Sequence, residues 1–429
     1  MESTNERALI VSSDGHAMPN MRQYRQYLPE KLRERFDEFC VYNDEHGAAP
    51  MDPAHLRNRL DPDVVEEWIT AMCEPGRLEG CADPVKRLAE MEREGIVAEV
   101  LFPDFGLPFQ AKPPTPTRRY DAGPAWPPRT VEEIDEGNRA HNRWLVDYCS
   151  TAPERFCGMA ILSFDDVDAA MSEIRWARAS GLRGVVLPTF TPEFPIFHAK
   201  FEPIWDLLEE LDMPLNSHIA LSATSPMVMY SGVPHPVLAM PLHTGEMMFR
   251  CHEVLAHLIW GGVLERHPRL TVAFTEQGSA WTISALESWD FSYEGSYLRR
   301  DVREAVPLMP SEYFHRQCWL GSSLFTRAEI EARHQIGIDV MLLGMDYPHH
   351  EGTFGAGTTN YLRATLGAVG VPSDEARKLL GGNAIERWGF DGPHLRELAD
   401  RFGPELAVLL TPPEEDLFPR GDVSKPLAA

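Results

Sequence analysis

Short apolar runs that alternate with helical patterns restrict most strongly what this chain of 429 residues can fold into. Most of these runs are continuously apolar, which is typical of parallel strands buried on both faces. The expected strands are Ala8–Ser13, Val97–Pro103, Phe156–Ser163, Gly184–Pro188, Met213–Ser217, Leu270–Thr275, Cys318–Ser323 and Val340–Met345. The helical patterns between them include Thr130–Ser150, Asp166–Ala179, Phe201–Leu211, Glu246–Leu264 and Thr326–Gln335. This alternation predicts an α/β fold, a (β/α)8 TIM barrel, with a doubly wound open sheet as the alternative.

The lengths of the segments between the expected strands predict how the chain is divided into a domain, an insertion and loops. One domain is expected over residues 1–392, with a C-terminal extension over 393–429. Ala17–Ile96 is too long for a single crossover helix, so a capping insertion is expected there, after the first strand. Gly106–Arg129 and Ala220–Gly245 are rich in proline, which cannot continue a helix. They are expected to be long irregular loops over the active face, either as rigid surface loops or as walls of a substrate tunnel.

Composition limits the class of protein and its partners. A net charge of −25 argues against nucleic acid and anionic membranes as partners. No apolar run reaches the roughly 18–20 residues of a membrane span, and the polar start of the chain lacks the apolar segment of a signal peptide. The 7 cysteines are scattered, with no Cys-x-x-Cys pair, which favours reduced thiols. We therefore expect a cytoplasmic enzyme that acts on a small molecule and assembles as a homo-oligomer.

Acids and histidines follow several of the expected strands. Asp14-Gly15-His16 ends the first strand, and His218, Glu276 and Asp346 end three later ones. The carboxyl ends of all strands open onto one face of a barrel, and that face carries the chemistry. Carboxylate and imidazole together suit a divalent first-row metal such as Zn, Mn or Fe.

Further donors leave two interpretations open. His252 lies on the helical pattern after His218, and His349 follows Asp346. Glu276, His252 and His349 could together hold a second metal. Alternatively, His252 is a helix-face residue and His349 is an outer partner of a metal-bound group. Glu276 itself suits either a metal ligand or a general base.

Several segments resemble the amidohydrolase superfamily, in its amidohydrolase-2 branch of relatives of aminocarboxymuconate-semialdehyde decarboxylase. The matching segments are Asn142–Trp144, Pro153–Phe156, Gly181–Pro188, Gly261–Pro268, Gly344–His349, Gly382–Ala384 and Trp388–Phe390. This resemblance implies a metal held by Asp14, His16, His218 and Asp346. The sequence departs from the family pattern twice: Asp14 replaces the first histidine of a His-x-His motif, and Glu276 replaces the strand-six histidine of the decarboxylases.

Other segments resemble a narrower group, the TIM-barrel nonheme diiron monooxygenases of platensimycin and platencin biosynthesis. They are Ser12–Pro19, Phe102–Gly106 and Thr275–Gly278, together with the long first insertion. This resemblance implies two Fe ions, O2, an external electron donor and a bulky diterpenoid or CoA-linked substrate in antibiotic biosynthesis. Glu276 and His349 would then be catalytic ligands of the second iron, with His252. The alternative is a mononuclear Zn or Mn decarboxylase or hydrolase of a small carboxylic or aromatic acid. A third option is a metal-binding barrel without activity.

Overall fold

A computed structural model describes most of the chain, namely residues 6–46, 53–57, 62–104, 106–110, 129–219, 221, 238–295, 300–354 and 356–414. The central parts of both proline-rich segments, 111–128 and 222–237, lie outside the described residues. So does the end of the predicted C-terminal extension, 415–429.

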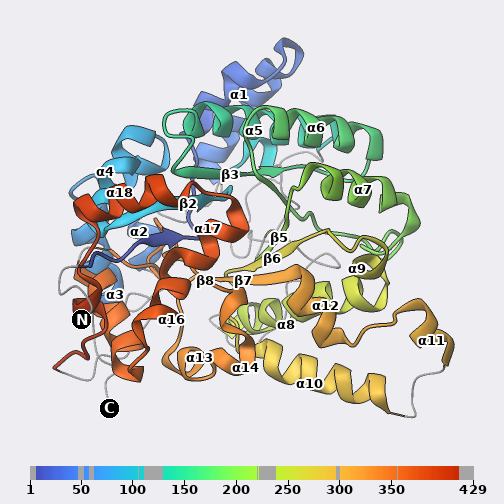
Figure 1. Ribbon diagram of the computed structural model, residues 1–429. Helices are drawn as coiled ribbons and strands as arrows, with labels where there is room; N and C mark the ends of the chain where they lie inside the picture. The colour runs from blue at the N-terminus through green and yellow to red at the C-terminus, as the bar shows by residue number, and fades with distance from the viewer. Residues whose placement is uncertain are drawn as a thin grey trace.

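Eight parallel strands form the centre of the described fold, in the order in which they occur in the sequence (Figure 1). They are β1 Ile10–Ser12, β2 Ile96–Leu101, β3 Phe156–Ile161, β4 Gly184–Val186, β5 Leu215–His218, β6 Val272–Thr275, β7 Cys318–Ser322 and β8 Met341–Leu343. Every residue of these strands is buried, as expected for a parallel sheet that is filled inside and covered outside. Each strand falls at one of the predicted runs.

The first and last strands meet, which makes the sheet a barrel. The Ser13 N–H donates to the Leu343 carbonyl oxygen at 2.7 Å, and Gly15 pairs in parallel with Tyr347. The (β/α)8 TIM barrel predicted from the sequence is therefore confirmed, and the open-sheet alternative is excluded.

Helices surround the strands (Figure 1). The helices are α1 Glu30–His46, α2 Pro53–Arg57, α3 Pro62–Trp68, α4 Pro84–Glu94, α5 Val131–Cys149, α6 Val167–Ala179, α7 Glu202–Leu211, α8 Ala239–Trp260, α9 Val263–Arg266, α10 Trp281–Glu294, α11 Arg300–Ala305, α12 Pro310–Gln317, α13 Arg327–Glu331, α14 Arg333–Ile336, α15 Ala356–Leu362, α16 Ser373–Arg377, α17 Asn383–Trp388, α18 Gly392–Phe402 and α19 Leu406–Leu409. Local sequence sets their ends: α4 begins after Asp83, whose side chain accepts from two backbone N–H groups, and ends at Gly95 in the left-handed conformation.

The long insertion after β1 contributes α1 to α4. Figure 1 shows α1 projecting from the edge of the barrel. Trp68, at the end of α3, is buried and donates from Nε1 to the Pro348 carbonyl oxygen at 3.0 Å. Its ring belongs to a small apolar cluster that includes Tyr347 and Phe354. The insertion is thus packed against the loop that follows β8.

The end of the described chain packs beside the first strand. The Ala8 N–H donates to the Pro404 carbonyl oxygen at 2.7 Å, so the segment after α18 lies beside the start of β1.

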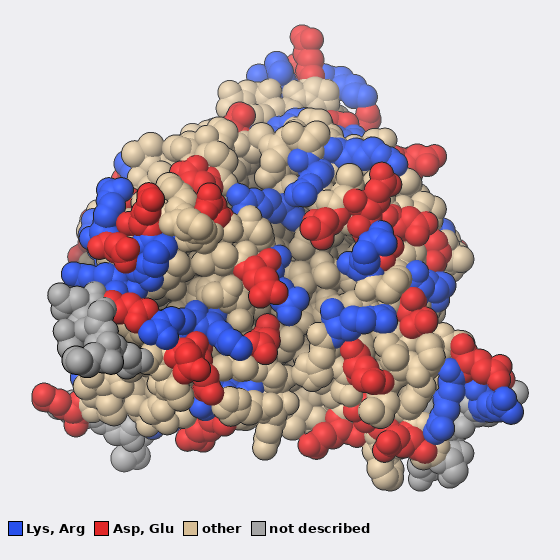
Figure 2. Space-filling view, viewed as in Figure 1, with Lys and Arg blue, Asp and Glu red and all other residues tan. Residues whose placement is uncertain are grey.

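Figure 2 shows acidic and basic side chains interspersed over the visible face, without one acidic region that would account for the net charge. Within the described residues, no helix has both the length and the apolar character needed to cross a membrane.

Candidate metal centre

The first and last strands bring three potential ligands together. His16 Nε2 lies 3.3 Å from Asp346 Oδ1 and 3.8 Å from Asp14 Oδ1, and all three side chains are at most 3% exposed. The Asp346 N–H donates to the Asp14 carbonyl oxygen at 3.0 Å, which holds the two strand ends in register. The predicted convergence of Asp14, His16 and Asp346 therefore follows from closure of the barrel.

The two histidines at strand ends have a defined orientation. His218 Nε2 lies 3.3 Å from Asp14 Oδ1, while its Nδ1 is 2.9 Å from the Ile219 carbonyl oxygen. His16 Nδ1 is likewise 3.2 Å from the Pro103 carbonyl oxygen. Because a carbonyl oxygen can only accept, Nδ1 carries the hydrogen in both rings. Each Nε2 is then the ring atom that faces the carboxylates, and it is the atom that would bind a metal.

Glu276 and Asp346 share an unusual backbone conformation. Their φ angles are 58° and 55°, in the left-handed region, which costs about 1–3 kcal/mol for a residue with a side chain. Both residues directly follow the carboxyl end of a strand or its short extension, where this turn keeps their carboxyl groups in the cluster. Glu276 Oε2 lies 3.6 Å from His218 Nδ1.

The pKa values of the two carboxyl groups are shifted in opposite directions. Burial, together with the negative charges of Asp346 and Asp14, raises the pKa of Glu276 well above its ordinary value. Burial would also raise the pKa of Asp346, but His349 and His16 outweigh it and hold this pKa well below the ordinary value. The surroundings therefore favour the charged form of Asp346 and the protonated form of Glu276.

His349 lies between two acids. Its Nδ1 is 3.0 Å from Asp346 Oδ1, and its Nε2 is 3.4 Å from Asp104 Oδ2. Its ring stacks on that of His16 with centroids 4.3 Å apart. Burial lowers the pKa of His349, but the carboxylates of Asp346 and Asp104 raise it further, so the net shift is well upward. Asp104 follows β2, and this position after a strand is the only feature of the sequence that predicts its place beside the cluster.

The donor set fits a divalent cation. The atom His16 Nε2 is buried and makes no hydrogen bond within the described part of the chain, and carboxylate oxygens of Asp14 and Asp346 lie beside it. An unsatisfied buried polar atom costs about 1–3 kcal/mol, which a bound cation would remove. Three overlapping groups have ligand atoms within 4.8 Å of one another: Asp14, His16, His218 and Glu276; His16, Asp104 and His349; and Glu276, Asp346 and His349.

Six of the seven predicted site residues belong to these groups of described residues, and His252 belongs to none of them. The α8 helix begins at Ala239, earlier than the helical pattern suggested, so His252 is not near its N-terminal end. Its ring stacks on Trp281 with centroids 4.4 Å apart. The sequence also gave no role to Ser323, whose hydroxyl donates to Asp14 Oδ2. Its position after β7 is the signal that could have indicated this contact.

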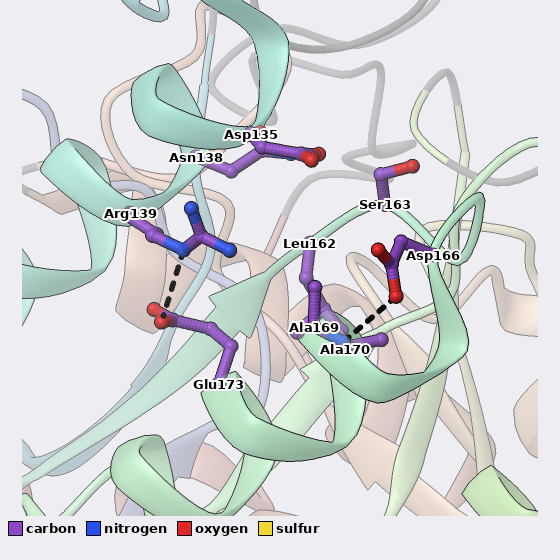
Figure 3. Close-up of a pocket in the computed structure, with 9 residues that line it drawn as sticks. All are labelled: Asp135, Asn138, Arg139, Leu162, Ser163, Asp166, Ala169, Ala170 and Glu173. Atoms are coloured by element: carbon purple, nitrogen blue, oxygen red, sulfur yellow. Dashed lines mark hydrogen bonds and ion pairs between the residues drawn. The ribbon is translucent and has the colours of Figure 1, made fainter. Parts of the chain in front are cut away.

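A separate polar hollow lies between α5 and α6 (Figure 3). Its lining residues are Asp135, Asn138, Arg139, Leu162, Ser163, Asp166, Ala169, Ala170 and Glu173. The Arg139 Nε is 3.6 Å from Glu173 Oε2, and Asp166 accepts from the Ala169 N–H at 3.0 Å. None of its lining residues belongs to the three groups of potential ligands among the described residues.

Comparisons with known proteins identify relatives. A family model described as Amidohydrolase matches residues 98–390. Gamma-resorcylate decarboxylase of Rhizobium sp. strain MTP-10005 is 25% identical over 230 residues, which cover 52% of this chain and 68% of the relative. The 2-amino-3-carboxymuconate-6-semialdehyde decarboxylase of Dictyostelium discoideum is 24% identical over 320 residues, which cover 72% and 78%. A solved 5-carboxyvanillate decarboxylase of Novosphingobium aromaticivorans, complexed with manganese, shares the fold with a TM-score of 0.57 and 17% identity, over 91% of this chain and all of that one.

These relatives overturn the predicted reaction. The expectation of a nonheme diiron monooxygenase, an oxidoreductase of antibiotic biosynthesis that uses O2, is wrong, because the named relatives are decarboxylases. The segments that suggested that group are strand ends, which the barrel itself constrains. In Ser12–Pro19, for example, the Ser12 hydroxyl donates to the Asp14 carbonyl oxygen at 2.6 Å and accepts from the Met345 N–H. Such contacts hold the strands together whichever reaction the site catalyses.

The length of the match to the family model and the shared barrel fold establish the family of this chain. The family model spans more than half of the 429 residues and covers most of β2 and all of β3 to β8, with the strand ends that carry His218, Glu276 and Asp346. The barrel that carries them is also the fold of the solved relatives. The chain belongs to the amidohydrolase family.

Proposed function

We propose that this protein is a metal-dependent decarboxylase of a small aromatic carboxylic acid. The observation that carries the proposal is the buried cluster of imidazole and carboxylate groups at the strand ends, in a chain whose named relatives are decarboxylases. In the reaction, the bond between a ring carbon and the carboxylate breaks, CO2 leaves and a proton takes its place. Such an acid replaces the bulky or CoA-linked substrate expected from the sequence.

The proposed metal ligands are Asp14, His16, His218 and Asp346. Their mixture of nitrogen and oxygen donors suits Mn or Zn, and a solved relative was crystallised with manganese. A bound divalent cation would act as a Lewis acid toward oxygen atoms of the substrate. His349 would keep the Asp346 carboxylate in place through its 3.0 Å contact. This set accounts for the buried His16 Nε2, which makes no hydrogen bond within the described residues.

Glu276 is the proposed catalytic acid that replaces the family's strand-six histidine. Its side chain is 26% exposed, whereas that of the neighbouring His218 is only 2% exposed, so Glu276 is accessible to a substrate. Its raised pKa favours the protonated carboxyl group, and a general acid needs that proton. Glu276 would deliver this proton to the ring carbon as CO2 leaves.

The test is CO2 release by purified protein under anaerobic conditions. Protein stripped with a chelator, and then reloaded with Mn²⁺ or Zn²⁺, is incubated with 2,6-dihydroxybenzoate and with 5-carboxyvanillate. We expect CO2 release only from the reloaded protein. Metal-loaded protein that releases no CO2 from either acid, or that instead hydrolyses aromatic esters or amides, would contradict the proposal.

A further inference from the structure

A buried ion pair lies directly behind the first strand's ligands. Arg87 of α4 is 1% exposed, and Glu99 of β2 is fully buried. Arg87 Nε donates to Glu99 Oε2 at 2.7 Å, and Nη2 donates to Oε1. This is the two-point contact that a planar guanidinium makes with a carboxylate, which fixes both groups in orientation as well as in distance.

The backbone between two proposed ligands rests on this pair. A Cβ atom added to Gly15 would lie 2.2 Å from Glu99 Oε1 and 2.9 Å from Arg87 Nη2. No side chain fits at that position, which explains the glycine between Asp14 and His16. The ion pair therefore fills the space directly beside the Gly15 backbone.

The same guanidinium also contacts the end of the last strand. Arg87 Cζ lies 3.3 Å from the centre of the Tyr347 ring, the residue after Asp346. The Tyr347 hydroxyl donates to the Arg77 carbonyl oxygen at 2.5 Å, and its own carbonyl oxygen accepts from the His16 N–H at 2.8 Å. One side chain from the long insertion thus supports the backbone beside ligands of both β1 and β8.

We propose that Arg87 is a positioning residue of the metal centre, and that its pair with Glu99 sets the separation between His16 and Asp346. This role rests on the proposed metal centre and gives the insertion after β1 a function in metal binding. The shape of the guanidinium matters as well as its charge, so replacing Arg87 with a lysine should weaken metal binding even though the positive charge is kept.

The experiment compares Arg87→Lys with a matched control, Arg155→Lys. Arg155 is also buried, donates to Glu92 at 3.0 Å, and has its guanidinium 5.5 Å from the Phe402 ring. It contacts the other end of β2 by donating to the Val97 carbonyl oxygen at 2.8 Å. The dissociation constant for Mn²⁺ is measured by chelator competition, with thermal unfolding of the metal-free protein as the measure of general damage.

We expect Arg87→Lys to raise the Kd for Mn²⁺ roughly 10–100-fold, the usual effect of losing a group that orients metal ligands, and Arg155→Lys to leave it unchanged. The visible spectrum of Co²⁺-loaded protein should shift only in Arg87→Lys. An unchanged Kd in Arg87→Lys, or an equal rise in both variants, overturns the positioning role.

If Arg87→Lys does not fold, Tyr347→Leu serves as the second variant. It removes the ring beneath the guanidinium and leaves the pair with Glu99 in place. The same 10–100-fold rise is expected, and an unchanged Kd overturns the inference. Failure of the wild-type protein to bind Mn²⁺ would instead contradict the proposed function, so the two failures are distinguishable.

Discussion

His16 Nε2 lies 3.3 Å from Asp346 Oδ1, and this nitrogen makes no hydrogen bond with the residues that the structure describes. The two residues follow the first and the last strand, and the backbone pairing between those strand ends keeps them together. A buried nitrogen that faces a carboxylate without a hydrogen bond is unfavourable unless a further group binds to both. The proposed metal supplies that group.

Removal of His218 should remove a ligand. In His218→Ala, the Kd for Mn²⁺ is expected to rise by more than the roughly 10–100-fold that loss of an outer partner causes. His267→Ala is a suitable control, because His267 is also buried but pairs with Glu202 at 2.9 Å outside the cluster. Elemental analysis measures the metal content of both purified variants. A full complement of metal in His218→Ala would show that His218 is not a ligand.

Replacement of Glu276 distinguishes a role as proton donor from a role as metal ligand. Glu276→Gln keeps the size of the side chain and removes its proton-donating carboxyl group. The proposed role predicts unchanged metal content and decarboxylation slower by about 10²–10⁴-fold. Metal content and the rate of CO2 release are measured on the same preparation. A large loss of metal would make Glu276 a ligand, and full activity would leave it with neither role.

The strands and most of the site could be predicted because they depend on local sequence patterns. A buried parallel strand is a short apolar run, and the barrel brings the residue after each run to one face. His218 and Asp346 were therefore identified without knowledge of their contacts. The reaction could not be predicted in this way, because the residues that hold a barrel's strand ends together are compatible with more than one chemistry.

Other parts of the site depend on contacts that the sequence does not display. Arg87 occupies a helix with many charged residues and resembles a solvated side chain, although it is buried. Glu99 gave a usable signal, since a charged residue within the apolar run of β2 requires a buried partner. The helical pattern predicts a later start for α8 than Ala239, which is why it predicts His252 near the N-terminal end of that helix.

Space beside Asp14 is limited at Gly344. A Cβ atom there would lie 2.6 Å from Asp14 Cβ and 3.0 Å from the Ser322 carbonyl oxygen. Gly344→Ala should therefore lower the free energy of unfolding by about 1–3 kcal/mol and weaken metal binding. Gly245→Ala, within α8 and with open space around it, should instead be stabilising by about 0.5–1 kcal/mol. Urea unfolding of both variants measures whether the two substitutions change the free energy of unfolding in opposite directions. A stabilised Gly344→Ala would contradict the close packing.

A buried histidine should make stability depend on pH. Burial lowers the pKa of His141 to about 3, and its Nδ1 lies 2.9 Å from the Tyr24 hydroxyl. Below the ordinary pKa of about 6.5, the unfolded chain binds a proton that the folded protein does not, so stability falls by up to about 1.4 kcal/mol per pH unit. His141→Asn should reduce the loss between pH 7 and pH 5 by about 2 kcal/mol. Urea unfolding at both pH values measures it, and equal losses in the two proteins would contradict a neutral, buried His141.

The most direct test of the account is the fate of the substrate carbon in D2O without oxygen. Metal-loaded protein is incubated anaerobically with 2,6-dihydroxybenzoate, and the products are analysed by mass spectrometry and NMR. The account predicts one CO2 per acid consumed and one deuterium on the carbon that carried the carboxylate, with no product from metal-free protein. Turnover that requires O2, or a product that keeps the carboxylate and gains oxygen, would contradict it.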